Sequence, residues 1–126
     1  MHDPQNLQSF AVSVTDDDVA ELRRRLAEAR WPDRIDGTGW EYGCDVDWLH
    51  DLAGYWANDF DWRAAEARIN AFDQVVATVD GQRIHTVHQR SPEPDALPLL
   101  VSHGWPGSIV EFLDVIGPLT DPAAHG

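Results

Sequence analysis

The sequence predicts a protein of the α/β class, in which a helical region at residues 1–72 precedes strands and a further helix at residues 73–126. Three observations support this prediction. Apolar residues recur at helical spacing up to about residue 72, and from Val75 they recur at every second position. A short, continuously apolar run at Leu99–Ser102 is typical of a strand buried on both faces of a parallel sheet. We therefore expect two sequence regions with a boundary near residue 72.

Composition limits the partners that the protein can have. The chain has 126 residues, of which 43% are hydrophobic and 10% aromatic, so it is long and apolar enough to bury a core. Its formal net charge is −13, and all nine basic residues are arginines. A surface of this charge repels nucleic-acid phosphates and anionic lipid headgroups, so we expect neither nucleic acid nor membrane as a partner.

The cell compartment is predicted from cysteine use and from the start of the chain. Cys44 is the single cysteine, which excludes an internal disulfide and suits a reducing cytoplasm. Residues 1–6 have neither a basic start nor an apolar stretch, so they do not resemble a signal peptide. No run approaches the roughly 18 apolar residues that a membrane-spanning helix needs. These features predict a cytoplasmic protein.

Three helices are predicted in the first region, each from the residue that would cap it. Thr15 precedes three aspartates and an apolar series, and Asp47 and Asp61 each precede a further helical pattern. Trp31-Pro32 should end the first helix, because a residue before proline avoids helical geometry. Aromatic residues are frequent in this region, and we expect them to pack between elements rather than to bind a ligand.

A β-hairpin is predicted at the start of the second region. Asp80-Gly81 is a strong signal for a two-residue turn, and it separates two segments of alternating pattern. Such a turn would pair the strands as follows: Val79 with Gln82, Ala77 with Ile84, and Val75 with Thr86. The face that carries these pairs is mostly apolar.

The segment after the predicted buried strand is the strongest indication of chemistry. It consists of His103, Gly104, Trp105, Pro106, Gly107 and Ser108, and a helical pattern follows it. Its first glycine would let the chain leave the strand, its second would permit a tight turn, and Ser108 with Glu111 has the spacing of a capping box. Pro106 would keep the Trp105 amide out of a helix, and a free N–H there stabilises developing negative charge. The alternative is a plain connector between a strand and a capped helix.

Other reactive side chains have simpler explanations. Ser108 lacks the Gly-Xaa-Ser-Xaa-Gly surroundings of a nucleophile, and its capping role accounts for it. His85 and His88 lie three positions apart on a strand and would point to opposite faces, so we expect no metal there. Cys44 has no evident activating base. We expect His103 to be a buried, hydrogen-bonded residue that orders the turn.

A resemblance to a known family extends over nearly the whole chain. The residues that carry it are Leu22-Arg23-Arg24-Arg25-Leu26, Arg30-Trp31-Pro32, Trp40, Gly43, Tyr55-Trp56, Phe60-Asp61-Trp62-Arg63, Glu66, Asn70, Asp80-Gly81, Ile84-His85, His88, Pro98-Leu99-Leu100, Ser102 to Ser108, and Glu111-Phe112. Together they resemble the microsomal-type epoxide hydrolases. The N-terminal residues are the more specific part, because His-Gly-Xaa-Pro recurs in several hydrolase families.

The resemblance implies a fold, a reaction and a set of partners. Residues 1–72 would be the helical N-terminal domain, and residues 73–126 would be the first strands and first helix of an α/β-hydrolase fold, truncated there. The reaction implied has two steps and uses no cofactor and no metal: a carboxylate opens the epoxide to an alkyl ester, and activated water hydrolyses the ester. The partners implied are a small-molecule epoxide, water, and the remainder of the hydrolase domain in the same or a second chain. The oligomeric state stays open.

The resemblance places one catalytic group on this chain, the backbone N–H of Trp105 as a donor in the oxyanion hole. The rest of the loop would support it, namely His103, Gly104, Pro106, Gly107 and Ser108. A cis bond between Trp105 and Pro106 is also implied. The aspartate nucleophile, the histidine with its acidic partner and the lid tyrosines are expected beyond residue 126.

Two other interpretations stay open. The chain would then be a non-catalytic remnant or one subunit of a split enzyme, or it would belong to a different α/β-hydrolase such as a haloalkane dehalogenase or an esterase. Dehalogenases carry asparagine at the position of Trp105, and many esterases carry further glycines there; neither pattern is present. A strand at Leu99–Ser102 without its neighbours would leave backbone groups unpaired, so we expect rapid amide exchange there.

Overall fold

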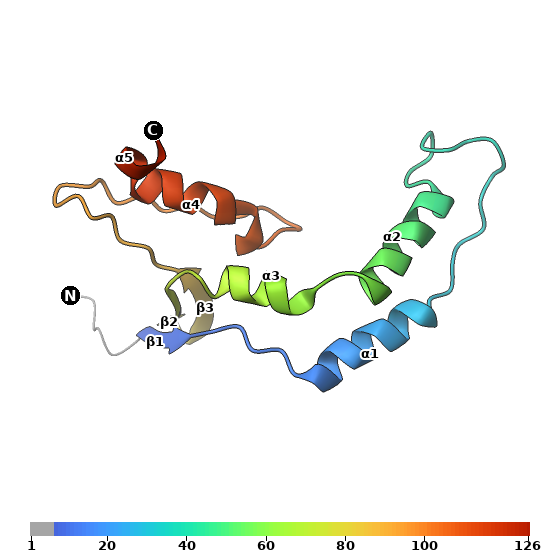
Figure 1. Cartoon of the computed structure of the whole chain (residues 1–126), viewed down its shortest axis with the longest axis horizontal. Coiled ribbons are helices and arrows are strands. Elements are labelled where there is room, and N and C mark those ends of the chain that lie inside the picture. The colour runs from blue at the N-terminus through green and yellow to red at the C-terminus, as the bar shows by residue number, and fades with distance from the viewer. Residues whose placement is uncertain (1–6) are drawn as a thin grey trace. The chain divides into compact units, whose positions relative to one another are not determined.

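The computed structural model describes residues 7–126, and the predicted absence of a signal peptide at residues 1–6 lies outside them. The elements, in chain order, are β1 (Leu7–Phe10), α1 (Asp16–Ala27), α2 (Val46–Asn58), α3 (Trp62–Ile69), β2 (Gln74–Val79), β3 (Gln82–Val87), the 3₁₀ helix η2 (Ile109–Phe112), α4 (Leu113–Thr120) and α5 (Pro122–His125) (Figure 1). They form two compact units, residues 13–64 on one hand and residues 7–12 with 65–126 on the other. The sequence boundary near residue 72 stays a prediction.

Helix α1 begins as predicted and ends earlier than predicted. Thr15 is its N-cap, and the Thr15 hydroxyl oxygen accepts a hydrogen bond of 3.1 Å from the Asp18 N–H. The helix ends at Ala27, where Glu28 leaves helical geometry while its N–H still donates to the Arg24 carbonyl. Trp31-Pro32 therefore lies in the following loop and does not end the helix.

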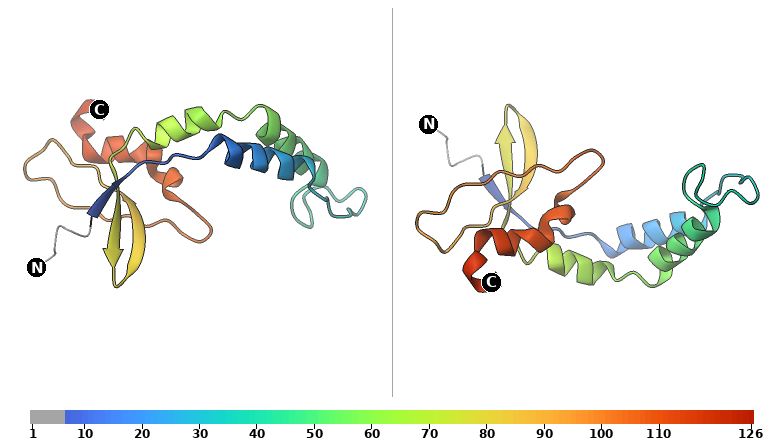
Figure 2. Two further views of the ribbon diagram at one scale, coloured as in Figure 1. Left: turned by 90° about the horizontal axis from the view of Figure 1, so that it is seen from below. Right: turned by 90° about the horizontal axis from the view of Figure 1, so that it is seen from above.

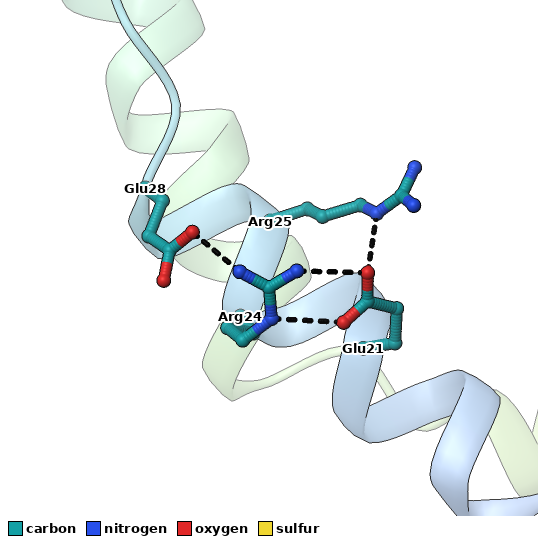
Figure 3. Close-up of polar contacts among 4 residues, drawn as sticks. All are labelled: Glu21, Arg24, Arg25 and Glu28. Carbon is teal, nitrogen blue, oxygen red and sulfur yellow. Dashed lines mark hydrogen bonds and ion pairs between the residues drawn. The ribbon is translucent and has the colours of Figure 1, made fainter.

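An exposed cluster of charges lies along α1. The Glu21 carboxylate accepts from Arg24 through two hydrogen bonds of 2.8 and 2.9 Å and from Arg25 through one of 2.7 Å (Figure 3). Arg24 also donates to Glu28 over 2.5 Å. These residues are three or four positions apart, the spacing that brings side chains together on a helix. The two arginines lower the pKa of Glu21 to about 2.

The low pKa of Glu21 gives a measurable titration. We expect its carboxylate to stay ionised until the pH approaches 2, whereas an unpaired glutamate titrates near 4.5. Because the folded-state pKa lies below the unfolded value, the contribution to helix stability is present above pH 4.5 and is lost as the pH falls toward 2. The ¹³C shift of the Glu21 carboxyl, followed against pH, measures this. A midpoint at the ordinary value would show that the arginines do not hold it in solution.

Helices α2 and α3 are both capped by aspartate. The cap of α2 is Asp45, whose Oδ1 accepts a hydrogen bond of 3.0 Å from the Trp48 N–H, so the predicted cap Asp47 is wrong by two residues. Asp47 lies in the first turn and forms an ion pair with Arg34. The prediction for α3 is confirmed, because Asp61 Oδ1 accepts a hydrogen bond of 3.0 Å from the Ala64 N–H.

The three strands form one antiparallel sheet in the order β1-β2-β3. The β2–β3 hairpin has the predicted register, with Val79 opposite Gln82, Ala77 opposite Ile84 and Val75 opposite Thr86. Strand β1 was not predicted; it pairs with residues 74–77 of β2, so the tip of the hairpin extends past it (Figure 2). The more buried face is not the apolar one identified from the pattern. Gln74 and Val76 are 4% and 6% exposed, whereas Val79 on the other face is 45% exposed.

The hairpin turn depends on glycine at one position. Asp80 and Gly81 have φ angles of 50° and 78°, which is the two-residue turn that suits the twist of a hairpin. A Cβ at Gly81 would meet nothing within 4 Å, so its effect would come from the backbone alone. We expect Gly81→Ala to destabilise the hairpin by about 1 kcal/mol, measured by urea unfolding followed by the β2 and β3 amide signals. Unchanged stability would show that the turn is not held at positive φ.

The predicted strand at Leu99–Ser102 is absent. These residues have no strand partner among residues 7–126, and Leu99, Leu100 and Val101 are exposed. The physical reason is that an apolar strand exists only where neighbouring strands satisfy its N–H and C=O groups.

No helix in residues 7–126 combines the length and the apolar composition that crossing a membrane requires.

Candidate active site

The loop that sequence analysis identified as the site of chemistry is fully exposed. Its central residue, Trp105, is 98% exposed, and the peptide bond between Trp105 and Pro106 is cis, as the resemblance implies. The Trp105 N–H lies in neither a helix nor a strand, and it has no hydrogen-bond acceptor in residues 7–126. An amide in this state is available to an anionic oxygen.

The start of the following helix is held by a capping box. The Glu111 carboxylate accepts a hydrogen bond of 3.0 Å from the Ser108 N–H, and the Ser108 hydroxyl accepts one of 3.3 Å from the Val110 N–H. The predicted capping role of Ser108 is therefore confirmed. The helix differs from the expected single α-helix, because its first turn is the 3₁₀ helix η2 and α4 follows at Leu113.

The two glycines of the loop differ in what they require. A Cβ at Gly107 would overlap the Glu111 carboxylate and would lie 2.8 Å from the Gly104 carbonyl oxygen, so the turn has no room for a side chain. A Cβ at Gly104 would meet nothing within 4 Å, and Gly104 has no left-handed φ. The absence of room for a side chain at Gly107 agrees with the tight turn predicted there. The backbone conformation reserved for glycine that was expected at Gly104 is not observed.

His103 is exposed, and the prediction that it is buried is wrong. Its Nδ1 lies 3.0 Å from the Gly104 carbonyl oxygen, which only accepts, so Nδ1 carries the proton. This bond joins adjacent residues, so His103 is hydrogen-bonded as expected, while its role in ordering the turn stays a prediction. The exposure follows from the absence of the strand at Leu99–Ser102, which would have placed His103 at the edge of a covered sheet.

The other residues singled out from the sequence have hydrogen-bond partners in the sheet or lie in another loop. His85 is hydrogen-bonded to Gln74, and the His88 N–H donates to the Asp73 carbonyl over 2.9 Å, which extends the hairpin. Cys44 is exposed in the loop before α2. In the described part of the chain, no three metal-binding side chains lie together.

Known proteins of one family match most of this chain. The family model described as "Epoxide hydrolase N terminus" matches residues 7–112. A relative from Stigmatella aurantiaca is 44% identical over 117 residues, which are 93% of this chain and 27% of that protein. "Epoxide hydrolase 1" of Sus scrofa is 32% identical over 126 residues, 97% of this chain and 28% of its own length. The chain therefore spans less than a third of these relatives.

Two solved structures are similar in fold. The crystal structure of juvenile hormone epoxide hydrolase from the silkworm Bombyx mori aligns with a TM-score of 0.82 and 28% identity, covering 90% of this chain and 31% of that one. The Aspergillus niger epoxide hydrolase aligns with a TM-score of 0.78 and 32% identity, over 86% of this chain and 29% of that one. The predicted α/β class, with a helical N-terminal part followed by the first strands, is confirmed by these structures.

Proposed function

The chain belongs to the epoxide hydrolase family, and from that premise we propose that it is the N-terminal portion of an enzyme that converts epoxides to vicinal diols. The observation that carries the proposal is the free N–H of Trp105, in a loop that lies within the region matched by the family model. The substrate class is a small-molecule epoxide, and the second reactant is water. The reaction needs no cofactor or metal.

The role of the Trp105 amide follows from the charge that forms in the second step. A carboxylate opens the epoxide and forms an alkyl ester, and water then adds to the ester carbonyl. The addition places negative charge on the carbonyl oxygen, and a backbone N–H directed at that oxygen stabilises it. Donors of this kind contribute about 10²- to 10³-fold to kcat. Trp105 would supply one such donor.

The neighbouring residues would hold that amide in place. The Nδ1–H of His103 donates to the Gly104 carbonyl, Pro106 keeps Trp105 out of a helix, and Gly107 allows the Glu111 carboxylate to reach the Ser108 N–H. We assign this set to support of the oxyanion donor. In this proposal residues 1–72 form the N-terminal domain, and residues 73–126 begin the hydrolase core.

The remaining catalytic groups are assigned to sequence that the relatives have outside the matched region. These groups are the carboxylate nucleophile, the histidine with its acidic partner, and the tyrosines that bind the epoxide oxygen. They would come from the remainder of the hydrolase domain, in the same chain or in a second one. We place the enzyme in the cytoplasm, because the single exposed cysteine and the acidic surface suit that compartment.

The test is the intact mass of the native gene product together with an assay of styrene oxide hydrolysis. The proposal expects a mass well above 14.1 kDa and conversion of styrene oxide to its diol. A native mass near 14 kDa without activity would favour a non-catalytic chain or a split enzyme. Diol formation by the 126-residue chain alone would contradict the assignment of the nucleophile to other sequence.

A further inference from the structure

The side chain of Asn70 binds the backbone that follows β1. Its Nδ2 donates to the Val12 carbonyl over 2.7 Å, and its Oδ1 accepts from the Val12 N–H over 2.8 Å. One side-chain amide thus satisfies both backbone groups of a residue 58 positions away, as a neighbouring strand would. Because the Val12 N–H only donates and its C=O only accepts, the orientation of the Asn70 amide is determined.

Gln74 continues this set of bonds into the sheet. Its Nε2 donates to Asn70 Oδ1 over 3.0 Å and to the Ile69 carbonyl over 3.2 Å. Both partners are acceptors, so the Gln74 amide also has one allowed orientation, with Oε1 on its other side. Gln74 is 4% exposed and is the one buried polar residue among residues 7–126. A buried amide with all its donors used makes a rigid junction.

His85 completes the set from β3. Its Nε2 lies 2.9 Å from Gln74 Oε1, and an amide oxygen only accepts, so Nε2 must carry a proton. The His85 ring also contacts the ring of Phe10 in β1, with a centroid distance of 4.7 Å. The direction of every bond from Val12 to His85 is therefore determined by the polarity of one backbone unit.

We propose that Asn70, Gln74 and His85 form a directional hydrogen-bond relay that fastens residues 7–12 as a strap along the edge of β2. The strap needs a fastening, because β1 has four residues, all of them exposed, and a strand this short is held weakly by its ladder alone. Releasing it would expose the edge of β2, which is a template for association with another chain. The relay goes beyond the proposed function and does not depend on it.

The test is Asn70→Asp in the 126-residue chain, with Asn58→Asp as the matched control of equal charge. At pH 7 the new carboxylate places an oxygen against the Val12 carbonyl, and we expect amide protection at Val12 and in β1 to fall about ten- to a hundredfold. Below about pH 3.9, the ordinary pKa of aspartate, the protonated acid offers one donor and one acceptor and should restore that protection. Asn58 donates to the Gly54 carbonyl within α2, so its variant should leave the strap unchanged.

Two further measurements keep the result decisive. The hollow that Asn70 lines is also lined by Asp73, His88 and Arg90, which carry ionisable groups of their own. The wild type and the Asn58→Asp control are therefore measured at both pH values, so that an effect of those groups is not attributed to position 70. The amide signals of α1 and α2 report whether a variant has lost its fold altogether. The ¹⁵N spectrum of the His85 imidazole should show a proton on Nε2 in the wild type. A neutral ring protonated at Nδ1, or strap protection unaffected by Asn70→Asp at pH 7, would overturn the proposal.

Discussion

Replacing Gln74 by glutamate is expected to destabilise the unit that contains the sheet by about 2–4 kcal/mol at pH 7. The change replaces the Nε2 donors by an oxygen that faces two acceptors, the Ile69 carbonyl at 3.2 Å and Asn70 Oδ1 at 3.0 Å. Asn70 cannot reverse its amide without losing both bonds to Val12. The position is 4% exposed, so water does not relieve the conflict.

The destabilisation by Gln74→Glu should depend on pH. Burial and the two facing acceptors raise the pKa of the introduced carboxyl above the ordinary value of about 4.3 for glutamate. The loss is therefore smallest below about pH 4.3 and grows as the pH rises toward the folded-state pKa. Urea unfolding at pH 4 and pH 7, followed by the β2 and β3 amide signals, measures it. Gln82→Glu is the matched control, since Gln82 is exposed at the hairpin turn; equal losses in the two variants would contradict the account.

The second large effect is expected for Gly107→Ala in the native gene product. The new Cβ would lie 2.8 Å from the Gly104 carbonyl oxygen and would overlap the Glu111 carboxylate. Glu111 can rotate away only by giving up the Ser108 N–H, whereas the Gly104 carbonyl can move only with the backbone. Trp105 lies between these two glycines, so its amide moves with the loop. We expect kcat for styrene oxide to fall about 10²- to 10³-fold, the loss for one oxyanion donor.

Gly54→Ala is the matched control for this variant. Gly54 lies in α2, where a Cβ would meet nothing within 4 Å, and alanine is the better helix former by about 1 kcal/mol. That variant should retain its activity and its KM for styrene oxide. If Gly107→Ala were equally active, the loop would not position a catalytic amide, and the oxyanion role of Trp105 would be rejected.

The sequence was sufficient to predict caps and turns that are formed by residues close together along the chain. Thr15, Asp61 and Ser108 each bond to an N–H two or three positions further on, and the Asp80-Gly81 turn sets the register of its own hairpin. The wrong prediction of Asp47 as the cap of α2 is an error of two residues. Asp45 and Asp47 both lie at the start of α2, and the pattern alone did not distinguish which one would cap it.

Features that depend on distant partners were not predictable. Strand β1 is four residues long, and its partners in β2 lie more than sixty positions along the chain. The alternation in the hairpin identified an apolar face but not the buried one, because burial depends on what covers a sheet. Leu99–Ser102 has the composition of a buried strand, but a strand also needs neighbouring strands to pair with, and composition does not show whether these are present. The relay through Gln74 could not be predicted from a local sequence pattern, because the residues that it joins, from Val12 to His85, come from four segments of the chain.

The contact between Val12 and Asn70 has a consequence for the layout of the gene product. It brings together, within one unit, the point where the chain leaves that unit and a point close to where the chain returns to it. Residues 13–64 thus form an insertion between two segments that the Val12–Asn70 contact holds together, and the entropic cost of closing such a loop grows only slowly with its length, by about 0.6 kcal/mol for each doubling. Changes of length in the segment between α1 and α2 should accordingly be tolerated by the sheet.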